Sequence, residues 1–134
     1  MATELISFGA LSKMYANLRA KLRKQIAQEF RQPAPVFLSW LHALTAIRNT
    51  CAHHGRLWNR ELAVKPELPK TWKAQGIDNK RLYVIALIVQ TLLSEVSPDS
   101  QWKERLKAHF NTYSSVDLAQ MQFPANWQNE EPWL

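Results

Sequence analysis

Apolar residues recur every three or four positions along most of this chain, and the residues that form tight β-hairpin turns are scarce. The chain has three glycines in 134 residues and contains neither Asn-Gly nor Asp-Gly. A spacing of three to four residues places apolar side chains on one face of an α-helix, whereas tight hairpins usually need glycine at the turn. The sequence therefore predicts an all-α fold.

We expect a helical bundle of four to five helices in one domain spanning residues 1–134, because a chain of this length can bury its own core. The expected helices cover residues 9–30 (with residue 5 as an alternative start), 36–54, 79–96, 97–110 and 116–121. Residues 61–79 contain Pro66, Pro69 and Gly76, which predicts a long ordered loop. Residues 123–133 carry apolar anchors without a period, which predicts an irregular C-terminal strap.

Four local signals set these boundaries. The first helix should end at Pro33 and Pro35, and Gly55 stands where the second helix needs a C-terminal cap. Ser97 and Pro98 match an N-cap followed by proline at the first helical position. Two apolar stripes should face the core. They are Leu11, Met14, Tyr15, Leu18, Leu22, Ile26 and Phe30 in the first helix, and Phe37, Trp40, Leu41, Leu44 and Ile47 or Cys51 in the second.

Composition and cysteine content favour a protein of the reducing cytoplasm. The longest apolar run, residues 82–96, is interrupted by Gln90 and Ser94, so we expect a core helix and no membrane span. No export signal is expected either, because no basic leader with a following apolar run opens the chain. A single cysteine, Cys51, excludes an internal disulfide.

Positive charge is concentrated in the first half of the sequence. Residues 1–60 hold nine Lys/Arg against two Asp/Glu, a balance of +7, whereas residues 61–134 hold eight against nine, a balance of −1. A local positive field attracts polyanions, so nucleic acid is the expected class of partner, with Lys21, Arg23 and Lys24 as candidate phosphate contacts. A solvated basic helix face that binds nothing is the alternative.

The run from Ile47 to Arg60 joins three arginines, two histidines and two asparagines at the end of the second expected helix. Arginine can fork onto phosphate oxygens, and histidine can give or take a proton near neutral pH. Arg48, Asn49 and His53 are therefore candidates for RNA cleavage, with His53 as base or acid, Arg48 as the cation that stabilises the phosphorane, and Asn49 as an orienting group. In the alternative interpretation, Arg48 and Asn49 only bond nearby backbone and His53 is an interior histidine.

Helix geometry separates two of these candidates. At 100° per residue, Asn49 and His53 lie about 40° apart, but Arg48 and His53 lie about 140° apart. Either the helix unwinds near residues 53–55, or two copies meet in a homodimer whose sites borrow groups from each other.

Other residues of the run are weaker candidates. His54, Arg56, Trp58, Asn59 and Arg60 are candidate substrate contacts, Trp58 by stacking on a base. Cys51 is expected to be a small core residue, and no metal site or other cofactor is expected because neither a second cysteine nor an acidic ligand lies nearby.

The run from Ile47 to Arg60 resembles the signature of the abortive-infection (Abi-like) proteins of bacteria. Ser7–Ser12 and Phe37–Leu41 before it, and Phe123–Trp127 near the end, extend the resemblance along the chain. Position by position, Arg48 is similar to the motif arginine, Asn49 to its polar neighbour and His53 to the motif histidine. His54, Arg56, Asn59 and Arg60 match the Abi-type extension.

This family is placed in the HEPN superfamily, which is defined by an Arg-x4–6-His motif. The resemblance implies a HEPN-like bundle, a dimer with a composite cleft, and metal-independent endoribonuclease activity against phage that leaves 2′,3′-cyclic phosphate ends. It also implies a non-catalytic alternative, a HEPN module that binds RNA, a nucleotide or an antitoxin partner. Because Abi-like proteins usually have a longer N-terminal part, such a region or an antitoxin is a further partner to expect.

Overall fold

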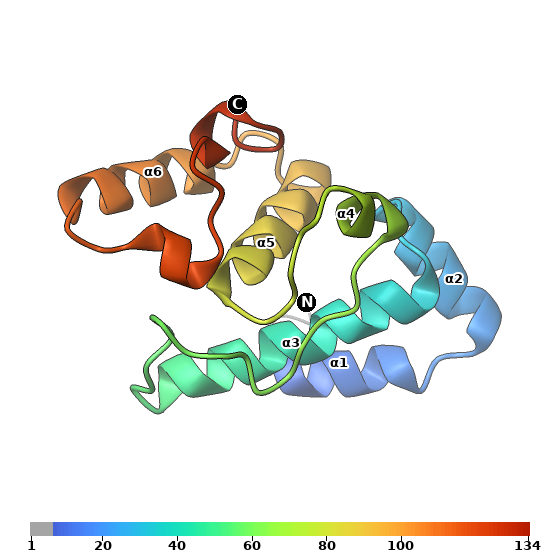
Figure 1. Ribbon diagram of the computed structural model, residues 1–134. Coiled ribbons are helices and arrows are strands. Elements are labelled where there is room, and N and C mark those ends of the chain that lie inside the picture. Colours follow the sequence, from blue (N-terminus) through green and yellow to red (C-terminus); the bar gives the residue numbers. More distant parts are fainter. Residues whose placement is uncertain (1–6) are drawn as a thin grey trace.

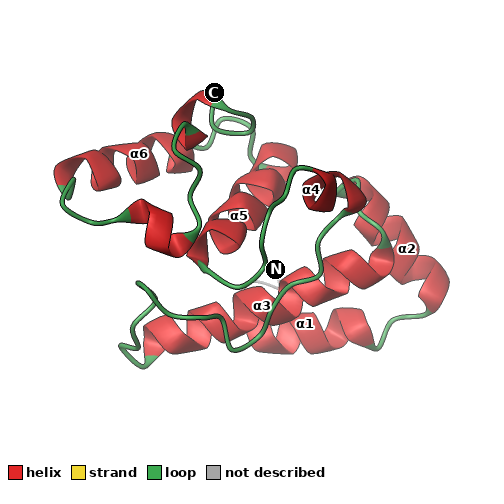
Figure 2. Cartoon of the chain, viewed as in Figure 1, coloured by secondary structure: helices red, strands yellow, loops and turns green. Residues whose placement is uncertain are grey.

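In the computed structural model, residues 7–134 are described, and over this range the chain is helical without a strand (Figure 2). This confirms the all-α prediction. The number of helices was underestimated, because six α-helices and two short 3-10 helices follow one another within residues 7–134. They are α1 (Phe8–Ala16), α2 (Ala20–Glu29), α3 (Ala34–Ala52), α4 (Lys70–Ala74), α5 (Leu82–Val96), α6 (Trp102–Thr112), η2 (Leu118–Met121) and η3 (Trp127–Asn129).

The expected first helix is in fact two helices. α1 ends at its C-cap Asn17, and α2 begins after Arg19, whose extended backbone serves as the N-cap. Two hydrogen bonds close the corner between α1 and α2. The Tyr15 hydroxyl donates to the Arg23 carbonyl (2.8 Å), and Arg23 Nη1 donates to the Ala16 carbonyl (3.3 Å). Burial raises the pKa of Tyr15, an effect that the nearby Arg23 partly opposes.

The corner allows aromatic rings from both helices to pack on α3. Phe37 is met by Tyr15 of α1 edge-on, at 5.0 Å between ring centroids, and by Phe30 after α2 in a stack at 4.8 Å. As Figure 1 shows, α1 lies alongside α3 and α2 lies across its N-terminal end. Four of the seven residues of the expected stripe are consequently not buried, since they are 37–49% exposed. These are Leu11, Met14, Leu22 and Ile26.

The long loop after α3 is present and is fixed to that helix. The Trp40 indole donates to the Glu67 carbonyl (3.0 Å), and the Ser39 hydroxyl accepts from the Glu67 amide (2.6 Å). Near its ends, the Leu62 amide donates to the Lys80 carbonyl (2.7 Å). The short helix α4 lies within this loop, where Trp72 stacks on Trp40 at 5.2 Å.

α5 is the central helix, as its apolar sequence predicts. One face packs with α3 and the long loop in a cluster of Val36, Trp40, Ala43, Leu62, Val84, Ile85 and Ile88. The other face packs with the C-terminal segment in a second cluster of Tyr83, Ala86, Leu87, Met121, Phe123, Trp127 and Trp133. A helix buried on two sides must be apolar almost all round, which explains the run of residues 82–93.

The C-terminal strap is confirmed, whereas the expected start of α6 was wrong. Residues 97–100 form a turn in which the Ser100 amide donates to the Ser97 carbonyl (2.9 Å), and the helix begins at Trp102, four residues after Pro98. Along the strap, the Trp133 indole donates to the Tyr83 hydroxyl (3.3 Å). Burial raises the pKa of Tyr83.

Within residues 7–134, no helix combines the length and the apolar character that crossing a membrane requires.

Candidate functional site at the C-terminal end of α3

The second expected helix ends in a Schellman cap, and the cap is built from the histidines of the motif. His53 is the C-cap, the His54 amide donates to the Cys51 carbonyl (3.1 Å), and the Gly55 amide donates to the Thr50 carbonyl (2.7 Å). The residue after the C-cap must be left-handed in this motif, and His54 has φ = +55°. The glycine predicted for that role stands one position later.

Gly55 is required for a different reason. A Cβ atom at this position would stand 2.6 Å from Thr50 Cγ2 and 3.0 Å from the Thr50 carbonyl oxygen. The chain leaves the helix so tightly that only a residue without a side chain fits. His54 therefore has a strained backbone conformation. The corresponding position after α4 is occupied by a glycine, Gly76, with φ = +77°.

The four candidates of the helix end, Arg48, Asn49, His53 and His54, are exposed to solvent. Exposure excludes the interpretation of His53 as an interior histidine. Cys51 is exposed as well, so its prediction as a core residue was wrong. Of the two stripe alternatives, Ile47 is the one that packs against the core.

The cap bears on the first of the two geometries left open by the sequence. α3 stays regular through Ala52, the His53 amide still donates to the Asn49 carbonyl (3.1 Å), and the chain leaves the helix over residues 53–55. The two positions Arg48 and His53 keep their separation of about 140° around the helix axis. Asn49 and His53 share one side, about 40° apart.

After the cap, the chain turns back along α3 and carries Arg56 and Arg60 with it. Together with the C-terminal half of the helix, they line a small pocket of ≈ 40 Å³ whose other walls include Ile47, Thr50 and Leu62. This volume holds about one or two water molecules rather than a nucleotide. Asn59 has φ = +50°, which turns the chain between Trp58 and Arg60. Both arginines are exposed to solvent.

Cations are needed at this site because of the charge at the end of α3. The C-terminal end of an α-helix carries a partial negative charge, so it repels an anion that no cation accompanies. Any phosphate bound here must be held by arginine side chains. The Lys80 backbone lies beside the segment that follows the motif, because its carbonyl accepts from the Leu62 amide. This contact was not predicted, because only the folded loop brings Lys80 back to the motif.

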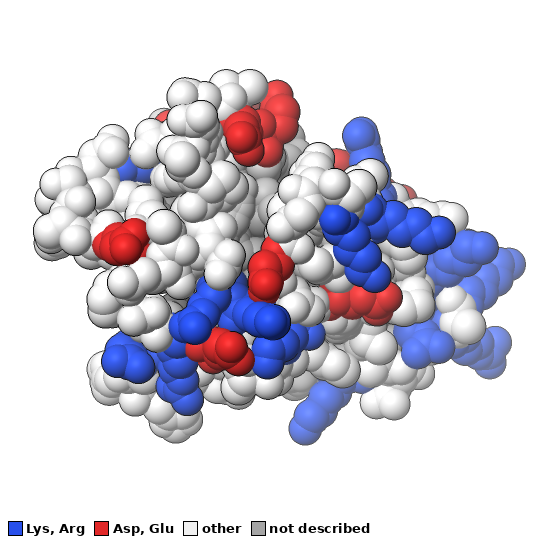
Figure 3. All heavy atoms as spheres, in the orientation of Figure 1, with Lys and Arg blue, Asp and Glu red and all other residues white. Residues whose placement is uncertain are grey.

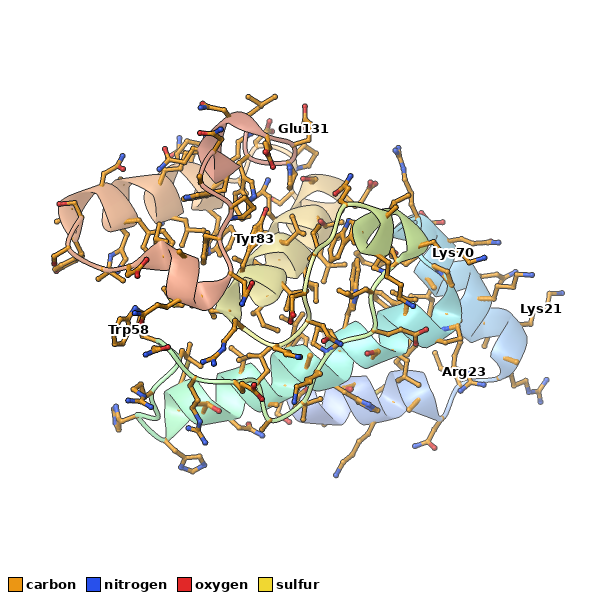
Figure 4. The ribbon with its side chains drawn as sticks, in the orientation of Figure 1. Lys21, Arg23, Trp58, Lys70, Tyr83 and Glu131 are labelled. Atoms are coloured by element: carbon orange, nitrogen blue, oxygen red, sulfur yellow. The ribbon has the colours of Figure 1, made fainter. Side chains whose placement is uncertain are left out.

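The three basic candidates of α2 lie at the other end of the molecule. α2 crosses the N-terminal end of α3, a helix of 19 residues, so the helix length alone separates the groups by about 28 Å. Figure 3 shows one group of Lys and Arg side chains at α2 and another beside the C-terminal half of α3. Figure 4 shows Lys21 and Arg23 on the side opposite Trp58. Lys21 and Lys24 are exposed, but Arg23 is half-buried and bonds the end of α1.

Trp58 is 41% exposed and borders a hollow formed by the segment after α3 and by α6. The α6 residues of this hollow had no predicted function. Among the described residues there is no group of three or more His, Cys, Asp or Glu side chains that could hold a metal ion.

Comparison with known proteins agrees with the resemblance in the first part of the chain. A family model described as Abi-like protein matches residues 1–59, which include α1 to α3 and the motif as far as Asn59. The similarity noted at Phe123–Trp127 lies outside the matched range. No curated protein and no solved structure matches the chain. Over residues 1–59, the chain is therefore similar to Abi-like proteins.

Proposed function

We propose that the chain is a metal-independent endoribonuclease of the abortive-infection type, with HEPN-like sites shared between two copies. The observation that carries this proposal is the exposed helix end, where Arg48, Asn49 and His53 accompany Arg56 and Arg60. Each group suits one need of RNA cleavage, namely binding a phosphate, stabilising added negative charge, and transferring a proton.

The reaction uses the RNA's own 2′-hydroxyl. Its oxygen loses a proton and attacks the adjacent phosphorus, the bond from phosphorus to the 5′-oxygen breaks, and that oxygen takes up a proton. The products are a 2′,3′-cyclic phosphate and a 5′-hydroxyl. His53 transfers the proton at one of the two oxygens and water serves the other, while Arg48 holds the developing charge on the phosphorane.

The angle around α3 supports a shared site. Because the positions of Arg48 and His53 lie about 140° apart around an ideal helix, one straight helix does not aim both side chains at the same phosphate. A two-fold dimer that brings two α3 ends together pairs Arg48 of one copy with His53 of the other. It also doubles the number of cations around the RNA.

Incubation of total RNA with the protein in EDTA tests the activity. We expect cleavage that leaves 2′,3′-cyclic phosphates, no cleavage of DNA, and loss of about 100- to 10,000-fold in rate for His53→Ala and for Arg48→Ala. RNA binding should stay within a few-fold in both variants. Activity that survives both substitutions, or that requires Mg²⁺, would contradict the mechanism.

The second candidate function is a non-catalytic module that binds RNA, a nucleotide or an antitoxin. The observation in its favour is that four apolar side chains of α1 and α2, Leu11, Met14, Leu22 and Ile26, are 37–49% exposed, because exposed apolar surface can contact another protein. RNA binding with no cleavage under any of the conditions above would favour this candidate.

A further inference from the structure

The hollow beside Trp58 lies next to the motif and has the size and lining of a small ligand site. Its volume is ≈ 360 Å³, within the range of about 300–1,000 Å³ that is usual for ligand pockets. Three elements far apart in the sequence form it: the segment after α3, the start of α5, and α6 with the chain that follows. Its walls are Leu57, Trp58, Leu82, His109, Phe110, Tyr113, Val116 and Met121.

The aromatic residues of this hollow divide into a floor and a rim. Phe110 packs edge-on against Phe123 and Trp127 of the second core cluster, and Met121 is fully buried, so both belong to the floor. Trp58 and Tyr113 form the rim and are 41% and 55% exposed. His109 joins the rim, with its ring 4.9 Å from that of Tyr113. Rim rings left this exposed offer flat faces on which another ring can stack.

The charged residues near the hollow indicate which kind of ring-containing ligand it binds. Arg56 and Arg60 flank Leu57 and Trp58 in sequence, Arg81 directly precedes Leu82, and Arg105 lies one helical turn before His109 on the same face of α6. Asp117, the nearest acid along the chain, caps η2 by accepting from the Ala119 amide (3.0 Å). A second hollow between α5 and the strap, of ≈ 590 Å³, is bordered instead by Glu130 and Glu131, which repel phosphate. Cations therefore neighbour the lining residues of the Trp58 hollow in sequence, whereas acids themselves line the other hollow.

We propose that the Trp58 hollow binds one unpaired base of a single-stranded RNA, stacked on Trp58 and Tyr113, with its flanking phosphates on Arg56 and Arg60. Trp58 follows His53 by five positions, so the bound base belongs to a nucleotide close to the cleaved phosphate. This inference rests on the proposed function for its RNA ligand. It adds to that function a pocket that selects where along a strand cleavage occurs.

Binding by variants in a non-cleaving His53→Ala background provides the test. Fluorescence anisotropy with a labelled single-stranded RNA measures affinity for the parent, Trp58→Ala, Tyr113→Ala and Trp58→Phe. Stacking contributes about 1–3 kcal/mol per base, so each alanine variant should bind about 5- to 150-fold more weakly. Trp58→Phe keeps a ring and should recover most of the loss. Val96→Ala, at a side chain that is 63% exposed on α5, serves as the matched control.

An abasic scan identifies the base itself. Removing the base at one position of the RNA should weaken binding to the parent as much as Trp58→Ala does, and the two changes together should cost no more than either alone. Circular dichroism of each variant confirms that the fold is retained. A Trp58→Ala and a Tyr113→Ala variant that both bind within two-fold of the parent would overturn the proposal, as would a parent that binds no RNA.

The binding test of the hollow and the cleavage assay can fail independently of each other. Base-dependent binding in a protein that never cleaves RNA would support the hollow and reject the nuclease. Cleavage that is unchanged in rate and position by Trp58→Ala would support the nuclease and reject the hollow.

Discussion

His54 holds the most costly backbone position of the candidate site. A left-handed conformation costs a residue with a Cβ about 1–2 kcal/mol relative to glycine, and His54 adopts it at φ = +55°. Residues that break a local rule at a conformationally strained position are candidates for function, because stability alone favours their replacement.

Replacing His54 by glycine separates stability from function. We expect His54→Gly to stabilise the fold by about 1 kcal/mol, because it relieves the strain without changing the Schellman hydrogen bonds. Urea unfolding measures the change. If the imidazole contacts RNA, the same variant should bind or cleave RNA less well despite its greater stability. A variant that is more stable and fully active would show that His54 has no part in the site.

The neighbouring glycine gives the opposite prediction. Gly55→Ala places a methyl group 2.6 Å from Thr50 Cγ2, so it should destabilise the fold by about 1–3 kcal/mol. Adding Thr50→Ser removes that Cγ2 and keeps the hydroxyl that donates to the Ala46 carbonyl. The double variant should therefore regain part of the lost stability in urea unfolding. An equal loss in the single and double variants would contradict this account of Gly55.

At the scale of elements, the period of the apolar residues was sufficient to predict α3, α5 and the central place of α5. It was not sufficient at Asn17–Arg19, where neither proline nor glycine marks the break between α1 and α2. There the chain turns because Tyr15 and Phe30 both pack on Phe37, an arrangement that only the assembled fold provides. Ser97 and Pro98 led to a wrong predicted start for α6, because the same two residues are equally compatible with the turn that precedes this helix.

The candidate site, like the fold, was predicted only in part from the sequence. The motif, its position at a helix end and the separation of Arg48 from His53 all follow from local sequence and helix geometry. The Trp58 hollow does not, because His109 and Tyr113 come from a helix about fifty residues further along the chain. Arg23 is a third case. Its charge suggested a phosphate contact, but its guanidinium bonds the last turn of α1.

At the scale of the whole molecule, two groups of positive charge lie at opposite ends of α3, and this predicts two kinds of RNA contact. Charge reversal at Lys21 and Lys24 should weaken binding of an RNA of about sixteen nucleotides and reduce its salt dependence, but should leave an RNA of about four nucleotides unaffected. Arg56→Glu with Arg60→Glu should weaken the binding of both. Anisotropy titrations over a salt series measure these effects. Equal losses for both RNA lengths at Lys21 and Lys24 would contradict the separation of the two groups.

A shared site makes the strongest prediction about the assembled molecule. In a dimer where Arg48 of one copy works with His53 of the other, an Arg48→Ala copy paired with a His53→Ala copy has one damaged site missing both groups and one intact site. Random pairing makes half of the dimers mixed, so mixing two inactive variants should restore about a quarter of the parent's activity. Unfolding and refolding the two variants together, followed by the RNA cleavage assay, gives the measurement. Each variant refolded alone is the control. If the mixture stays inactive while light scattering shows dimers, Arg48 and His53 do not meet across the interface.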